Sequence, residues 1–329
     1  MAERNRSMLT KKLRIAACLA LAGVLGLSTA QAVSDPPFSF VALGDLPYGS
    51  NEKSYANYRA LIDRINRVQP VFSVHVGDIK SGSSECSDQL YTEQLEMFGR
   101  FEGAVVYTPG DNEWTDCHRI SNGRYNPIER LSVLRQRFFK PGRSLGAVPI
   151  RVDNQSNLMP AHAAFVENQR WMHRGVLFAT VHIVGSNNNF ESRDAQAVQE
   201  FFERDAANVA WIEAAFAHAR QRQARALVLA FQADMFESKS VWEDFPASSG
   251  FQRSIQQTLL PLARSWGRPV LVVHGDSHRF RIDQPFTLEG QPLTNITRLI
   301  VPGANDVRAV HVRVGPDSGF KFELLEPLR

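Results

Sequence analysis

The chain has 329 residues, of which 43% are hydrophobic and 22% are charged. This is an ordinary globular composition with ample apolar material for a large core. The sequence contains no Gly/Ser linker, no low-complexity tract and no repeat of solenoid length, so it gives no reason to divide the chain into several domains.

Residues 1–32 have the pattern of a secretory signal peptide. Basic residues precede a short apolar run at 15–27, and an Ala-Gln-Ala tripeptide follows. The pattern predicts cleavage after Ala32 and no membrane span after that cleavage, with an uncleaved N-terminal anchor as the alternative. The segment carries a net charge of +4 in a chain of net charge +3, which leaves −1 on residues 33–329 and gives no indication of nucleic-acid binding.

Two cysteines, Cys86 and Cys117, remain after this segment is removed. An even pair in an oxidising compartment is most simply a disulfide, and two free thiols are the alternative. We therefore expect a periplasmic or secreted protein with a Cys86–Cys117 disulfide, which would close a loop of roughly 30 residues.

The first part of the chain alternates strands and helices. Apolar runs predict strands at 38–43, 71–76 and 104–107, and apolar periodicity predicts helices at 55–68 and 88–101 between them. This alternation is typical of a largely parallel sheet. The three strands end in Gly44-Asp45, Gly77-Asp78 and Gly110-Asp111. Because parallel strands end at one edge of a sheet, we expect the three carboxylates along that edge.

The regular pattern lapses over residues 117–175. One amphipathic helix is predicted at 128–139, and prolines interrupt the rest. We interpret this region as an elaborated excursion over the site, in which residues 150–152 pair with a later run as a hairpin.

The remainder repeats the design of a strand followed by a polar loop. Strands are predicted at 176–184, 226–231 and 269–274, and later at 299–301, 307–314 and 320–325; helices are predicted at 194–222 and 251–266, the second bent near Pro261. Continuous apolar strands are buried on both faces, which predicts two sheets packed face to face with helices outside. We expect residues 33–329 to form this one domain.

Polar side chains collect at the predicted strand ends. They are Asp45, Asp78, Asp111, Asn112, Gln232, Asp276 and His278. Converging carboxylates resist ionising together, and one or two bound divalent cations offset that repulsion. Two such cations can hold the attacking and leaving oxygens of a phosphoryl transfer.

This series resembles the calcineurin-like metallophosphoesterases. That family carries GDxH, GDxxxxG, GNH[DE], a strand-end His and GHxH in this order. The matching stretches are Gly44-Asp45, Gly77-Asp78, Gly110-Asp111-Asn112-Glu113 and Gly275-Asp276-Ser277-His278. The resemblance implies a four-layer αββα sandwich of two mixed sheets and the metal-dependent hydrolysis of a small phosphomonoester or phosphodiester.

Several positions depart from the family pattern. Pro47 stands where the first motif has its His, Asp111 where the third has its Asn, and Asn112 where the third has the His that assists the leaving group. Gln232 takes the place of the strand-end His, and Asp276 that of the first His of the last motif. The residues that match outright are Asp45, Asp78 and His278.

Two hypotheses follow. In the first, Asp45, Asp78 and His278 hold one metal, and Asp78 bridges to a second that is held by Asp111, Asp276 and Gln232. This oxygen-rich set suits Mg²⁺, Mn²⁺ or Ca²⁺ better than Zn²⁺. In the second, catalysis is lost and the protein binds a metal or a phosphorylated ligand without turnover.

Two further side chains complete the first hypothesis. Asn112 would orient a substrate oxygen, and His118 would supply the acid from the neighbouring loop, unless His118 is a surface or disulfide-flanking residue. His75, His182 and His274 lie inside apolar strands and are expected to be hydrogen-bonded core histidines. Tyr48 is not assigned to the site.

Overall fold

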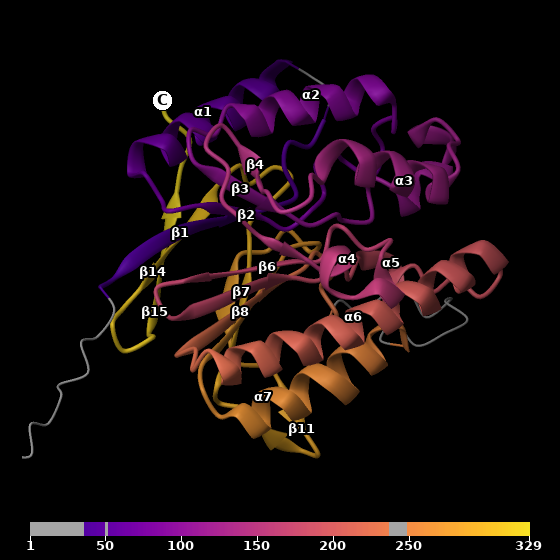
Figure 1. Ribbon diagram of the computed structural model, residues 1–329. Helices are drawn as coiled ribbons and strands as arrows, with labels where there is room; N and C mark the ends of the chain where they lie inside the picture. The colour runs from indigo at the N-terminus through magenta and orange to yellow at the C-terminus, as the bar shows by residue number, and fades with distance from the viewer. Residues whose placement is uncertain (1–35, 50–51, 237–248) are drawn as a thin grey trace, which may run out of the picture. The chain divides into compact units, whose positions relative to one another are not determined.

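The computed structural model describes residues 36–49, 52–236 and 249–329, so the predicted signal peptide at 1–32 lies outside the described residues. Two large mixed sheets pack face to face, and helices cover the outer face of each (Figure 1). The predicted αββα sandwich is confirmed.

The first sheet has the order β15-β14-β1-β2-β3-β4. Its strands are β1 (Phe38–Leu43), β2 (Ser73–His75), β3 (Ala104–Tyr107), β4 (Leu145–Gly146), β14 (Ala309–Val314) and β15 (Phe320–Leu325). The central three are parallel, and Leu43, His75 and Tyr107 lie side by side in register. The polar residues that follow β1, β2 and β3 therefore leave the sheet at one level.

The second sheet has the order β10-β13-β9-β8-β7-β6-β5. Its strands are β5 (Asp153–Asn154), β6 (Gln169–His173), β7 (Val176–Thr180), β8 (Ala226–Ala230), β9 (Val270–His274), β10 (Arg281–Asp283) and β13 (Ile296–Ile300). Strands β7, β8, β9 and β13 are parallel. A separate hairpin pairs β11 (Thr287–Leu288) with β12 (Gln291–Pro292).

Three apolar layers hold the sandwich together. The layer between the sheets contains Phe40 and Phe72 from the first sheet and Phe178 from the second, and their rings contact one another edge to face or stacked. The other two layers lie between each sheet and its helices. Burying both faces of each sheet explains why the central strands are continuous apolar runs.

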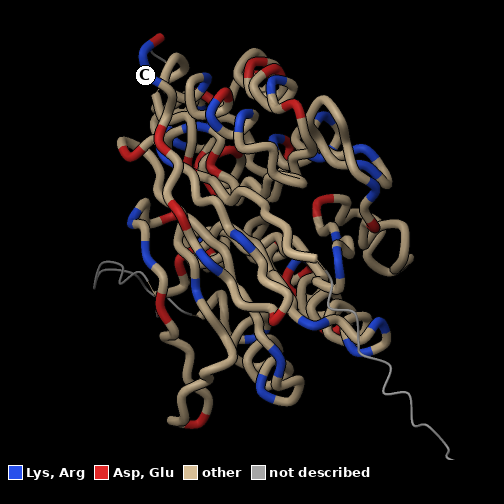
Figure 2. Tube along the Cα trace, turned by 90° about the vertical axis from the view of Figure 1, so that its left-hand side faces the viewer, with Lys and Arg blue, Asp and Glu red and all other residues tan. Residues whose placement is uncertain are grey.

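Helices α1 (Glu52–Val68), α2 (Asp88–Gly99) and α3 (Pro127–Phe138) cover the first sheet, and α6 (Ala195–Gln221) and α7 (Leu260–Trp266) cover the second (Figure 1). Side-chain caps start three of them: Ser87 accepts a hydrogen bond from the first turn of α2, Asn126 from that of α3 and Asp194 from that of α6. Lys and Arg are interspersed with Asp and Glu along the trace (Figure 2).

The structure corrects three predicted elements. The strand predicted at 176–184 ends at Thr180, because the Ile183 N–H turns back to the Val181 carbonyl. The helix predicted at 251–266 is π-helical over Gln252–Leu259 and becomes α-helical at Leu260, next to Pro261. The hairpin predicted at 150–152 forms at Asp153–Asn154.

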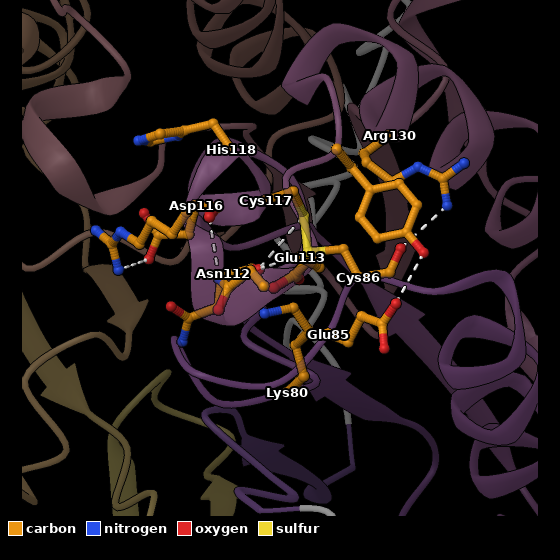
Figure 3. Close-up of a disulfide and its surroundings, with 12 residues drawn as sticks. Lys80, Glu85, Cys86, Asn112, Glu113, Asp116, Cys117, His118 and Arg130 are labelled. Atoms are coloured by element: carbon orange, nitrogen blue, oxygen red, sulfur yellow. Dashed lines mark hydrogen bonds and ion pairs between the residues drawn. A yellow bond between two sulfur atoms is a disulfide. The ribbon is translucent and has the colours of Figure 1, made fainter.

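A disulfide joins Cys86 to Cys117, as predicted. It links the loop between β2 and α2 to the 3-10 turn η1 (Thr115–His118), and both cysteines are fully buried (Figure 3). Across the described ranges, no helix combines the length and the hydropathy that a membrane span requires.

The segment before β6 is fixed to the second sheet through Glu167. This carboxylate is fully buried, accepts hydrogen bonds from the Arg135 guanidinium of α3, and lies 2.8 Å from Nδ1 of His182. Burial alone would raise the pKa of Glu167, but the Arg135 charge and the His182 hydrogen bond outweigh it and lower the pKa to about 2.

We expect the double variant Cys86→Ala/Cys117→Ala to lower the free energy of unfolding by roughly 3–4 kcal/mol, because the unfolded chain loses a closed loop with a sequence separation of 31 residues. Urea denaturation of the variant and the wild type measures the difference. Ser83→Ala, in the same loop, serves as the control. Equal midpoints for double variant and wild type would contradict the expectation.

Glu167 gives a second expectation, on pH. Its lowered pKa stabilises the fold above the ordinary value of 4.5, and that contribution is lost as the pH falls toward 2. Glu167→Gln should therefore be less stable at neutral pH, by up to roughly 3 kcal/mol, and should show a flatter dependence between those pH values. Acid denaturation measures both, with Glu289→Gln, in an exposed ion pair, as the control. If the free energy of unfolding depended on pH in the same way for Glu167→Gln and the wild type, the expectation would be wrong.

Candidate metal centre

Asp45, Asp78 and His278 form a cluster at the ends of β1, β2 and β9, which we call the trio. Each offers one ligand atom, and these atoms all lie within 4.8 Å of one another. The Nε2 atom of His278 lies 3.6 Å from Oδ1 of Asp45. Both carboxylates are buried, and His278 is one third exposed. The two sheets thus contribute to a single cluster with access to solvent.

The backbone at the trio is locally strained. Asp45, Asp78 and His278 have φ values of 53°, 54° and 57°, in the left-handed region that side-chain-bearing residues seldom adopt. The surrounding fold imposes these values: the Asp45 N–H donates to the Gly77 carbonyl, and the Asp45 carboxylate accepts from the Asp276 N–H at 3.1 Å. Such strain is concentrated at functional sites.

The carboxylates of the trio are electrostatically crowded. Burial raises the pKa of Asp45 well above its ordinary value, and the charge of Asp276 adds to the effect. Burial likewise raises the pKa of Asp78, followed by the charge of Asp111. A divalent cation would supply the missing positive charge. Since the donors are two carboxylates and an imidazole, the trio fits such a cation chemically.

Asp111 and Asp276 face a second point beside the trio. A Cβ atom on Gly185 would lie 2.9 Å from Oδ2 of Asp111 and 2.9 Å from each carboxylate oxygen of Asp276. The absence of a side chain at Gly185 therefore leaves room for whatever these carboxylates face. The pair sits between the sheets, since Asp111 follows β3 and Asp276 follows β9.

Gln232 crosslinks the two sheets at this point. Its Nε2 donates to Oδ1 of Asp111 at 3.0 Å, and its Oε1 accepts from the Gly185 N–H at 2.5 Å. The Ser186 hydroxyl donates to the other oxygen of Asp111 at 2.8 Å. In this arrangement Gln232 orients Asp111, and its own oxygen is already engaged.

Tyr48 belongs to the centre, although the sequence analysis did not assign it. Its hydroxyl donates to Oδ2 of Asp78 at 2.7 Å, accepts from Nδ2 of Asn112 at 2.7 Å, and lies 3.0 Å from Nε2 of His278. The Tyr48 and His278 rings pack edge to face. Burial, followed by the Asp78 charge, raises the pKa of the Tyr48 hydroxyl. The feature of the sequence that could have identified Tyr48 as part of the site was its position three residues after Asp45.

Asn112 and His118 occupy different surroundings. Asn112 lies in the centre, where Nδ2 donates to Oδ2 of Asp78 at 2.7 Å and its N–H donates to Oδ1 of Asp78 at 3.2 Å. His118 is exposed, and its Nδ1 lies 2.7 Å from the Thr115 carbonyl of its own turn. Figure 3 shows the His118 ring directed away from Asn112.

Glu113 holds the backbone that carries two of the candidate ligands. Its Oε1 atom accepts hydrogen bonds from the Asp78 N–H at 3.1 Å, the Gly110 N–H at 2.7 Å and the Tyr107 hydroxyl at 2.7 Å. Lys80 is buried nearby (Figure 3), and burial lowers the pKa of its ammonium group to about 8 against the opposing charge of Glu113.

The loop that follows β7 contains a left-handed turn of four consecutive residues. Ser186, Asn187, Asn188 and Asn189 have φ values of 53°, 54°, 57° and 58°. Each left-handed residue costs roughly 1–2 kcal/mol. Arg204 of α6 offsets this by donating to Oδ1 and to the carbonyl of Asn188. This turn holds the Ser186 hydroxyl against Asp111.

The three histidines predicted to lie in apolar strands are fully buried and hydrogen-bonded, as expected, although His182 lies just beyond the end of β7. His75 contacts the Leu46 carbonyl at 3.2 Å, and His274 contacts the Gly275 carbonyl at 3.1 Å. His182 contacts Glu167. They support the fold beside the centre without joining the trio.

No protein-family model matches the chain, and no curated protein matches it. Solved structures do. The Plasmodium protein titled "GAP50 the anchor in the inner membrane complex" aligns at a TM-score of 0.53 with 10% identity, over 89% of this chain and 86% of its own. PhoD aligns at 0.52 with 10% identity, over 89% and 70%. Purple acid phosphatase PPD1 from yellow lupin aligns at 0.53 with 13% identity, over 89% of this chain but 52% of its own.

PhoD and purple acid phosphatase are calcineurin-like metallophosphoesterases. The chain has their fold. The trio consists of the three residues that match the motif series outright. Of the substituted positions, Asp111 and Asp276 face Gly185, and Gln232 hydrogen-bonds to both Asp111 and Gly185.

We expect Glu113→Ala to lower the free energy of unfolding by roughly 3–5 kcal/mol, because two buried N–H groups and one hydroxyl lose their acceptor. Glu113→Gln keeps an oxygen acceptor and should lose less than half as much. Urea denaturation of metal-free protein measures both, with the exposed Glu102→Ala as the control. Equal losses for the Gln and Ala variants would show that Oε1 does not hold the strand ends.

Proposed function

We propose that the chain is an exported, metal-dependent phosphoesterase that hydrolyses a small phosphomonoester or phosphodiester. The observation that carries this proposal is the trio of Asp45, Asp78 and His278 at the strand ends of a metallophosphoesterase fold. Export is supported by the Cys86–Cys117 disulfide, since disulfides persist in oxidising compartments.

The trio would hold one divalent cation, and Asp111 with Asp276 would hold a second beside it. Mg²⁺, Mn²⁺ or Ca²⁺ is favoured over Zn²⁺ because oxygen donors predominate, and the Tyr48 hydroxyl adds one more oxygen next to Asp78. When bound, such a cation polarises a phosphoryl oxygen and makes hydroxide available near neutral pH. Gln232 keeps Asp111 oriented toward the second position.

The remaining roles fall to side chains that carry no metal. Asn112 would orient a substrate oxygen through its amide, but an amide does not release a proton near neutral pH. His118 is then the candidate proton donor to the leaving group, because it lines a cavity that adjoins Asp111 through Ser186. Histidine is the side chain that most often transfers a proton to or from a reacting group in enzymes, which suits that task.

A second function is a metal- or phospholigand-binding protein without turnover. Asn112 in place of a proton donor favours it. So does the structural likeness to a protein whose title calls it an anchor in the inner membrane complex of Plasmodium.

We expect purified protein to hydrolyse p-nitrophenyl phosphate or its bis-ester when Mg²⁺, Mn²⁺ or Ca²⁺ is added. Asp78→Ala should lower kcat by at least roughly a hundredfold, since the loss of a positioned ligand removes several kcal/mol of transition-state stabilisation. The exposed Asp317→Ala serves as the control.

Thermal stabilisation by added metal or by inorganic phosphate, measured on the same samples, separates the two functions. Stabilisation that requires Asp78 but comes without turnover would replace the enzyme by the binding protein. If the protein showed no turnover and no stabilisation, both functions would be excluded.

A further inference from the structure

A cavity of about 500 Å³ lies beside the candidate metal centre, and His118 occupies only part of its lining. Its walls are the turn η1 and the start of α3 on one side, and the left-handed turn at 186–189 and the start of α6 on the other. This volume lies within the range of roughly 300–1,000 Å³ that is usual for small-molecule sites.

The cavity adjoins Asp111 through two of its lining residues. Two of its lining residues hold that ligand candidate: the Ser186 hydroxyl donates to the Asp111 carboxylate at 2.8 Å, and the Thr115 hydroxyl donates to the Asp111 carbonyl at 2.9 Å. A molecule in the cavity would therefore end next to the proposed second metal position.

Two lining residues of the cavity, Asp116 and Arg119, lie close to Asn112. A Cβ atom on Gly82 would lie 2.9 Å from Oδ1 of Asn112, 3.4 Å from Nη1 of Arg119 and 3.5 Å from Oδ2 of Asp116. Arg119 and Asp116 line the cavity, so its polar wall faces the Asn112 amide across Gly82. Figure 3 shows Asn112 and Asp116 projecting to the same side of η1. Since Asn112 is the residue proposed to orient a substrate oxygen, an alcohol bound in the cavity would lie close to that oxygen.

The charges of the lining disfavour a second anionic group. Arg119 forms an ion pair with Asp116, and Arg193 forms one with Glu191, so each guanidinium already faces a carboxylate. Asp194 adds a further negative charge at the start of α6. A pyrophosphate or a polyphosphate would have to break these ion pairs to gain a cationic partner from either guanidinium, whereas a neutral alcohol would leave them intact.

The lining combines apolar surface with hydrogen-bonding edges. Ile128, Phe190 and Ala197 provide the apolar part, and the Phe190 ring is stacked on Phe201, which fixes its plane. Ser186 and Asn187 provide polar atoms opposite. An alcohol with a flat apolar face and polar edges matches this surface, which distinguishes a nucleoside from a simple sugar or a lipid.

We propose that this cavity binds the leaving alcohol of the substrate and that this alcohol is neutral and of nucleoside size, so that the preferred substrates are nucleoside monophosphate esters. The inference rests on the proposed phosphoesterase function and assigns a substrate class to it.

The test compares adenosine 5′-monophosphate, adenosine 5′-diphosphate and glycerol 2-phosphate as substrates. For the wild type, kcat/KM should be at least roughly tenfold higher for the monophosphate than for the other two, which corresponds to about 1.4 kcal/mol. Ile128→Trp fills the cavity and should lower the ratio of the monophosphate to glycerol 2-phosphate by a similar factor. Gln136→Trp, on an exposed face of the same helix, should leave the ratio unchanged.

Adenosine binding by calorimetry separates the cavity from the chemistry. Binding that Ile128→Trp abolishes and Gln136→Trp preserves supports the inference, even if no ester is turned over and the phosphoesterase function fails. Turnover without preference for the monophosphate would overturn the substrate class and leave the phosphoesterase function standing. The absence of adenosine binding at millimolar concentration, or equal binding by both Trp variants, would also overturn it.

Discussion

A single carboxylate oxygen holds together the strand ends that carry the candidate metal centre. Oε1 of Glu113 accepts from the backbone beyond β2 and from the backbone beyond β3, and also from Tyr107. It thereby fixes the positions from which Asp78, Asp111 and Asn112 project. The two carboxylates among them can converge only because the backbone that carries them is held in place, since like charges repel each other.

The centre is otherwise assembled by contacts between the sheets. Asp45 accepts from the backbone of Asp276, and Gln232 donates to Asp111; in each pair one partner follows the first sheet and the other follows the second. The carboxylates gain hydrogen bonds from these contacts but little positive charge. Burial, together with the neighbouring negative charges, therefore raises the pKa values of Asp45 and Asp78. A bound cation would supply the positive charge that these carboxylates lack.

Much of the fold followed from the sequence because its signals are local. Continuous apolar runs report burial on both faces, and a Gly-Asp pair after each run reports where a parallel strand ends. Short elements such as β4 and β10 escaped prediction, since pairing with β3 and β13 defines them more than their own sequence does. The disulfide was predicted because two cysteines, an even number, remain after the predicted signal peptide is removed.

The candidate site was predicted less completely, because its contacts join distant residues. Tyr48 meets Asp78 and His278, which lie 30 and 230 positions along the chain. The crosslink from Gln232 to Asp111 spans 121 positions. Motif spacing locates residues that coordinate directly, whereas side chains that orient those residues leave no periodic trace in the sequence.

The division of the trio between the sheets has a thermodynamic consequence. Asp45 and Asp78 follow strands of one sheet and His278 follows a strand of the other, so a cation held by all three is bound only when the sheets are docked. Docking and cation affinity are therefore linked, and each increases the other by the same free energy. A cation at this site would therefore stabilise the contact between the two sheets, and either sheet alone would bind it weakly.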